Sequence, residues 1–95
     1  MRIDDFIWLD QFVEKIEVKH DVFPEEVEEV FFNRPRIKRI RRGKVHREDL
    51  YRALGQTING RYLSVYFIYK PTARKALVIS ARDMDKKERK SYGRR

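Results

Sequence analysis

The segment Asn59–Arg82, NGRYLSVYFIYKPTARKALVISAR, decides the fold. Its first two residues, Asn59 and Gly60, both tolerate the positive φ values that a two-residue hairpin turn requires. A second turn is predicted at Pro71–Arg74, where proline presets the φ of an early turn position. These two turns separate three predicted strands: Glu48–Thr57, Tyr62–Tyr69 and Lys75–Ala81. Three consecutive strands with short connections predict an antiparallel meander.

Two helices are predicted ahead of the meander. Phe6–Leu9 is short and aromatic, which is typical of a strand, and the Asp10 carboxylate can then cap a helix over Gln11–His20. Pro24 suits the first position of a second helix, because its φ is fixed and it has no N–H to leave unpaired. Asn33 can adopt the left-handed conformation that ends this helix.

One further strand and one further helix complete the predicted elements. Arg36–Ile40 is expected as a strand before the meander. Asp85 and Glu88 stand three residues apart, the spacing of a capping box, and predict a short final helix that Gly93 can end. Helices followed by a run of strands predict an α+β fold, with two N-terminal helices packed on one face of an antiparallel sheet. We expect residues 1–95 to form a single domain.

The charge of the chain is divided unevenly. Residues 1–33 contain three Lys/Arg and ten Asp/Glu, a balance of −7, whereas residues 34–95 contain twenty and five, a balance of +15; together they give the formal net charge of +8. A basic surface of this size favours a phosphate backbone as partner, because neutralising phosphates releases condensed counterions. The alternatives are a solvated basic surface, or one covered by an acidic protein.

Composition excludes several classes of site. The chain contains no cysteine, so disulfides, thiol catalysis and thiolate metal sites are ruled out, and its two histidines make a poor metal cage. We therefore expect neither a metal nor a cofactor. No window approaches the roughly 18 apolar residues of a membrane span, and MRIDDF lacks the apolar core of a secretory signal. We expect a soluble, cytoplasmic protein with no membrane partner.

RNA cleavage without a metal suits the remaining residue types. Such a reaction needs groups that exchange protons with the 2′-hydroxyl and the leaving oxygen, and cations that stabilise the charged phosphorane. His20, at a helix C-terminus, is a candidate acid or base, or it simply closes the helix end by bonding a free carbonyl. Glu48, flanked by arginines, is a candidate base, or a salt-bridge partner.

Arginines supply the candidate phosphate ligands. Arg52 lies within the first strand of the meander and Arg82 at the end of its last strand, and the planar guanidinium can hold two phosphate oxygens at once. Both are counted with His20 and Glu48 as candidate catalytic residues. The other expected phosphate or RNA contacts are Lys19, Arg39, Arg41, Arg42, Arg89 and Tyr92.

Several pieces of the chain, taken in order, resemble the BrnT toxins of bacterial and archaeal toxin–antitoxin pairs. They are Trp8, KHDVFPEEVEEVF (Lys19–Phe31), ED-x-x-R (Glu48–Arg52) leading into ALGQT and NGR, and ISAR followed by ERKSY. The pattern departs from the family at Asp21, where the family has Lys-His-Gly, and at Phe12 and Ile16, where its first helix is polar.

The resemblance implies a RelE-like fold and an endoribonuclease that slows translation by cutting RNA. It also implies neutralisation by a BrnA-like antitoxin encoded beside the toxin, in a hetero-oligomer. Carried over by position, the family's functional residues fall on Lys19, His20, Glu48, Arg52 and Arg82, with Glu88, Arg89 and Tyr92 in the final helix.

Two other functional hypotheses remain open from the sequence. One is a degenerate, non-catalytic toxin that keeps the fold and binds nucleic acid or an antitoxin. The other is a ribosome-associated protein, since a small basic domain with interleaved aromatic residues also suits ribosomal RNA.

Overall fold

The computed structural model describes residues 1–45 and 47–93. Their elements follow the predicted order, which confirms the α+β class. The bounds are β1 (Asp5–Ile7), α1 (Asp10–His20), α2 (Pro24–Phe32), β2 (Arg36–Arg41), β3 (Leu50–Gln56), β4 (Tyr62–Lys70), β5 (Lys75–Asp83) and α3 (Lys86–Gly93). Within the described ranges, no helix has the length and apolar character needed to cross a membrane.

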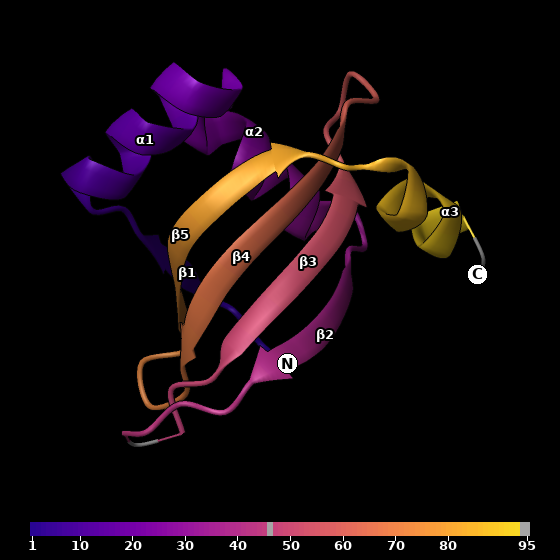
Figure 1. The fold of residues 1–95 in the computed structure, drawn as a ribbon. Coiled ribbons are helices and arrows are strands. Elements are labelled where there is room, and N and C mark those ends of the chain that lie inside the picture. The colour runs from indigo at the N-terminus through magenta and orange to yellow at the C-terminus, as the bar shows by residue number, and fades with distance from the viewer. Residues whose placement is uncertain (46, 94–95) are drawn as a thin grey trace.

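The strands form one mixed sheet in the order β1-β5-β4-β3-β2 (Figure 1). Strands β2, β3 and β4 each pair antiparallel with the strand that follows in the chain. Strand β1 instead runs parallel to β5, with Asp5 opposite Lys75. The prediction of an antiparallel sheet is therefore wrong at this edge. This pairing joins residues 70 positions apart, and a local hydrophobic pattern does not identify so distant a partner.

Helices α1 and α2 cover one face of this sheet. Helix α1 packs against β5, and α2 packs against β3 and β4. Figure 1 shows the two on the same side of the sheet, with α3 apart from them beside the end of β3. Between the helices and the sheet lies the main core, whose fully buried members include Ile16, Val27, Val30, Ala53, Val65, Phe67 and Val78.

We call the opposite side of the sheet the open face. Side chains alternate between the two faces along a strand, and directly paired residues share a face. Ala53, Val65 and Ala81 are buried beneath the helices, so their neighbours in sequence point to the other side. The centre of the open face therefore carries Lys38, Arg52, Leu54, Ser64, Tyr66, Ser80 and Arg82.

Helix α3 covers one end of the open face. Its Tyr92 packs with Leu54 and Met84 in a second, smaller core. The predicted capping box is confirmed: the Glu88 N–H donates to Asp85 Oδ1 at 2.8 Å, and the Asp85 N–H donates to Glu88 Oε1 at 2.9 Å. The capping box thus fixes the Glu88 side chain at the start of α3, over the sheet.

Two predicted helix signals are wrong in detail. Leu9, not Asp10, holds the N-cap position of α1, and Asp10 is the first helical residue, where the helix dipole favours a carboxylate. Asn33 closes α2 with a φ of −110°, and the left-handed residue is the next one, Arg34, with a φ of 50°. The Asn33 side chain donates from Nδ2 to the carbonyl of Gln56 at 3.0 Å, a bond that ties the end of α2 to β3.

The turn between β3 and β4 also differs from the prediction. Positive φ occurs at Gly60, with a value of 91°, but not at Asn59. Thr57 donates to the carbonyl of Arg61 at 2.9 Å and accepts from Gly60 at 3.0 Å. This is a three-residue loop closed by a glycine, the next most common hairpin after the two-residue turn.

Asp21, at the end of α1, is a left-handed residue with φ 52° and ψ 42°. An L-residue other than glycine loses free energy in this conformation, although Asp tolerates it better than most. We expect Asp21→Gly to raise the free energy of unfolding by up to about 1 kcal/mol, and Asp21→Val to lower it. Urea denaturation checks both, and a loss of stability in Asp21→Gly contradicts the expectation.

Candidate functional site

Arg82 and Glu88 form a two-pronged ion pair on the open face. Arg82 lies near the end of β5, opposite Ser64. Its Nη1 donates to Glu88 Oε1 at 2.8 Å and its Nη2 to Glu88 Oε2 at 3.1 Å. The hydrogen bond to Glu88 raises the pKa of the Arg82 guanidinium. The strand-end arginine expected to hold a phosphate therefore already holds a carboxylate.

The Glu88 carboxylate is buried and fully engaged. Ser64 Oγ donates to Oε2 at 3.1 Å, and Arg52 Nη1 lies 4.0 Å from the same oxygen. Burial alone would raise the pKa of Glu88, but hydrogen bonds from Arg82, the Asp85 backbone and Ser64 outweigh it, and the pKa is lowered. Glu88 therefore stays ionised and makes a weak general base.

Arg52 reaches the same carboxylate from β3. It is paired with Tyr66 on one side and with Lys38 on the other. Its Nε is buried and has no hydrogen-bond partner in the described part of the chain. Arg52 and Arg82, on strands separated by β4, thus converge on Glu88.

Tyr66 completes this cluster and was not among the predicted site residues. It lies on β4 directly opposite Arg52, and its ring centroid is 5.9 Å from Cζ of Arg82. The alternation of β4 could have indicated it, because Ser64 and Tyr66 fall on the face that carries the two arginines. We call Arg52, Tyr66, Arg82 and Glu88 the arginine cluster.

Glu48 lies far from the arginine cluster. It forms an ion pair with Lys70, whose Nζ is 2.6 Å from Oε1. Lys70 and Ser64, the partner of Arg82, are six residues apart on β4, which corresponds to roughly 20 Å. The structure does not bring Glu48 and Arg82 together.

His20 and Lys19 lie at the end of α1, on the helix-covered side. The His20 carbonyl accepts a hydrogen bond from Arg61 Nη2 at 3.0 Å. Arg61 also binds Asp83. Asp83 and Arg82 are adjacent on β5, so their side chains point to opposite faces of the sheet. His20 and the arginine cluster therefore lie on opposite sides of the sheet.

The remaining expected RNA contacts are dispersed. On β2, Arg39 points to the helix-covered side, 3.6 Å from Asp49, while Arg41 follows a bulge and Arg42 follows the strand. On α3, Cζ of Arg89 lies 3.9 Å from the Tyr62 ring centroid. Tyr92 is only 4% exposed and packs edge-on against Tyr62, which leaves little surface for a base.

The comparison with family models decides the family. The model described as "Ribonuclease toxin, BrnT, of type II toxin-antitoxin system" matches residues 10–88. The chain belongs to the BrnT family. The match ends on Glu88 and includes the whole arginine cluster. No curated protein matches the chain.

Membership of the BrnT family sets the general function. A type II toxin of this family is a ribonuclease, with RNA as target and an antitoxin as partner. No group of three or more His, Asp or Glu residues that could hold a metal ion occurs among residues 1–45 and 47–93.

Arg61 is a second residue that the predicted site omitted, although it belongs to the NGR piece of the BrnT resemblance. Its guanidinium binds the carboxylates of Glu26 and Asp83 and the backbone carbonyls of His20 and Asp21. It thereby fastens the end of α1 to α2 and β5. This role is structural, because all four groups lie away from the open face.

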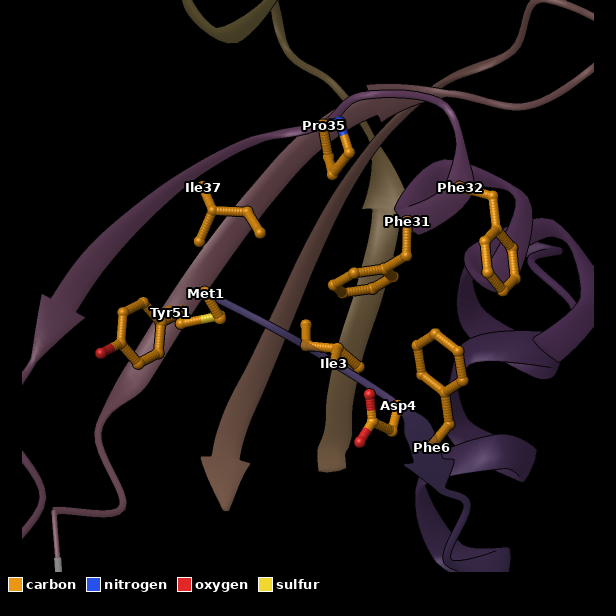
Figure 2. Close-up of a pocket in the computed structure, with 9 residues that line it drawn as sticks. All are labelled: Met1, Ile3, Asp4, Phe6, Phe31, Phe32, Pro35, Ile37 and Tyr51. Carbon is orange, nitrogen blue, oxygen red and sulfur yellow. The ribbon is translucent and has the colours of Figure 1, made fainter. Parts of the chain in front are cut away.

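An open cavity in this BrnT chain is separate from the arginine cluster. It has a volume of 720 Å³ and lies between β1, the end of α2 and β2. Figure 2 shows the rings of Phe6, Phe31 and Phe32 at one side of it and Ile37 and Tyr51 at the other. Most of its described lining residues are apolar or aromatic, and the one charged side chain among them is that of Asp4, a carboxylate, which does not suit a polyanion.

Proposed function

We propose that this BrnT protein is a metal-independent endoribonuclease that cuts RNA on the open face and thereby inhibits translation. The observation that carries the proposal is the convergence of Arg52 and Arg82 on one carboxylate. Two guanidinium groups fixed by strands are already arranged around an anion, as stabilisation of a phosphorane requires. The BrnT match supports the same reaction class.

The Glu88 carboxylate marks the position of the substrate's anionic oxygens. Arg82 reaches it with two parallel N–H···O bonds, an arrangement that a phosphate can also accept. In the proposal, the scissile phosphate binds at Arg82 in competition with Glu88, while Arg52 neutralises the growing charge. The capping box keeps Glu88 near enough to return when the product leaves.

Tyr66 is the proposed proton donor to the leaving oxygen. Its hydroxyl is the group in the arginine cluster that can give up a proton, and it lies between the two arginines. The proton of the attacking 2′-hydroxyl passes to solvent water, because the open face leaves the scissile phosphate in contact with solvent. In the sequence-based hypothesis His20 or Glu48 exchanged protons. Neither reaches a phosphate at Arg82 in this arrangement, so the proposal does not assign them that role.

The proposed partner is a BrnA-like antitoxin that covers the open face and excludes RNA. Basic side chains outside the cluster extend the RNA path in this proposal, and they are Arg41, Arg42 and Arg89. Lys19 and Arg39 lie on the helix-covered side and are not part of this path. The acidic residues of α2 form a separate surface that repels RNA.

The test is cleavage of RNA by the purified protein in EDTA. We expect fragments to appear without added metal, and a substrate with a 2′-deoxy sugar at the cleaved position to stay intact, because the 2′-hydroxyl is the nucleophile. Denaturing gel electrophoresis of end-labelled RNA reads both results. Cleavage that needs added metal, or that proceeds at the 2′-deoxy position, contradicts the mechanism.

One observation favours a second candidate, a non-catalytic module that binds RNA or an antitoxin. His20 and Glu48, the expected proton-exchange residues, lie apart from Arg52 and Arg82. The Arg82 guanidinium is already hydrogen-bonded to Glu88. Such a protein binds RNA with a steep salt dependence but yields no fragments in the same assay, and its induction does not arrest growth.

A further inference from the structure

A pocket lies on the helix-covered side of the sheet, at the end where β2 leads into β3. Its volume is 470 Å³. Its described lining residues are Arg39, Arg42, Gly43, Arg47, Asp49, Tyr51, Tyr69 and Pro71. Figure 1 shows the connection between β2 and β3 at the opposite end of the sheet from α3. Tyr69 is five residues from Ser64 along β4, roughly 17 Å, so this pocket is separate from the arginine cluster. We call it the loop pocket.

The loop between β2 and β3 is closed at its base. Asp49 Oδ1 accepts a hydrogen bond from the Gly43 N–H at 2.8 Å. A Cβ atom at Gly43 would collide with the carbonyl oxygen of Glu48, so only glycine permits this close approach. Arg47 has a φ of 59°, a left-handed conformation that costs free energy in an arginine. This backbone arrangement brings Arg42 and Arg47 to the same pocket.

Positive charge is concentrated around the loop pocket. Three arginines line it, and among its described lining residues Asp49 alone carries a carboxylate. Arg39 Nη1 lies 3.6 Å from Asp49 Oδ2, so this carboxylate already serves Arg39 and the loop backbone. Within residues 1–45 and 47–93, neither Arg42 nor Arg47 forms an ion pair, and both are exposed. Two guanidinium groups at this pocket are therefore open to an anion.

Two tyrosines also line the loop pocket. The rings of Tyr51 and Tyr69 stand at 89° to one another, with centroids 6.4 Å apart, so they form an aromatic corner. The Tyr69 hydroxyl donates to the Arg2 carbonyl at 2.6 Å. The Tyr51 hydroxyl forms no hydrogen bond with the described part of the chain, and it is not buried. A planar base stacks on such rings, and the free hydroxyl adds a donor beside the arginines.

We propose that the loop pocket binds a nucleotide, with its phosphate on Arg42 and Arg47 and its base against Tyr51. The planar guanidinium groups match phosphate oxygens, and the pocket volume lies within the range of small-ligand sites. A free nucleotide and a unit of an RNA chain present this same chemistry. Because the pocket is separate from the arginine cluster, the inference does not depend on ribonuclease activity.

AMP, inorganic phosphate and adenosine test the site in NMR titrations of the full chain. The backbone amides of Gly43 and Tyr51 should shift saturably with AMP. The dissociation constant for AMP should be about tenfold below those for phosphate and adenosine, because each of these lacks half of the contacts. If AMP binds no more tightly than inorganic phosphate, or if glutamate binds as tightly as AMP, the nucleotide site is refuted.

Variants test the residues assigned to the phosphate. Arg42→Gln should weaken AMP binding about tenfold. The matched control Arg34→Gln removes an exposed arginine at the other end of β2 and should leave binding within about twofold. Tyr51→Phe keeps the ring and should weaken binding about threefold, because it loses one hydrogen bond. Equal AMP affinities of the wild type and Arg42→Gln overturn the proposal.

A 2′-deoxyadenosine dinucleotide, which lacks the 2′-hydroxyl needed for cleavage, separates the two sources of the ligand. Its phosphate is a diester with one charge, whereas AMP carries a monoester with about two charges. Tighter binding of AMP assigns the pocket to a free nucleotide, and tighter binding of the dinucleotide assigns it to a nucleic-acid chain.

Failure of the proposed function gives a different pattern from failure of this inference. If AMP binds in the loop pocket but no RNA is cut under any condition, ribonuclease activity is refuted and the nucleotide site stands. If RNA is cut but AMP leaves the Gly43 and Tyr51 amides unperturbed, the ribonuclease stands and the nucleotide site is refuted.

Discussion

Replacing Arg82 with alanine should slow RNA cleavage about a hundredfold, because the charged phosphorane loses its two-pronged ligand. The rate is measured under single-turnover conditions in EDTA, so that product release does not obscure the chemical step. Arg82→Lys should recover only part of the rate, since an ammonium group keeps the charge but cannot present two parallel donors.

The control for this variant separates chemistry from folding. Arg82→Ala leaves the Glu88 carboxylate, which is 7% exposed, without its closest partner, and the protein is then less stable. The double variant Arg82→Ala/Glu88→Gln removes the unpaired charge and should recover stability while staying slow. Wild-type cleavage rates in the folded double variant would refute a catalytic role for Arg82.

Replacing Arg61 with alanine should lower the free energy of unfolding by about 3 kcal/mol. Its hydrogen bond to Asp83, the largest influence on it, raises the pKa of Arg61, and one guanidinium satisfies two carboxylates and two helix-end carbonyls. Alanine leaves all four of these groups without the guanidinium that binds them. Urea denaturation measures the loss.

The matched control for Arg61 is Arg2→Ala. Arg2 pairs with Asp4 at 2.8 Å, but its side chain is 75% exposed, so its loss should leave stability nearly unchanged. Arg61→Lys should retain only part of the stability, because one ammonium group cannot reach all the partners. If Arg61→Ala and Arg2→Ala unfold at the same urea concentration, the structural role of Arg61 is refuted.

Local signals predicted most elements of the fold. Pro24 begins α2, the turn at Pro71–Arg74 separates β4 from β5, and Asp85 and Glu88 form a capping box, all as expected. These signals work because each acts through bonds within four residues of itself. The predicted N-cap at Asp10 and the predicted left-handed residue at Asn33 are each one residue away from the observed position, because the exact ends of these helices depend on packing against neighbouring elements.

The site was less predictable because it depends on distant pairings. The arginine of each strand could be placed on the open face by alternation, but the bond from Arg82 to Glu88 depends on how α3 folds back over the sheet. The distance from Glu48 to Arg82 depends on strand register, which local sequence patterns do not determine. His20 is separated from them by the sheet itself, and only the packing of α1 on β5 determines that.

The parallel pairing of β1 with β5 has a consequence for the order of folding. The open face and α3 belong to residues 36–93, whose strands pair with their neighbours in the chain. Strand β1 joins β5 by closing a loop of 70 residues, so chain entropy is lost before any contact compensates for it. We expect the meander to form early and β1 to dock late. The face proposed to meet RNA is therefore specified by one contiguous stretch, and the first 35 residues supply the cover for the other side.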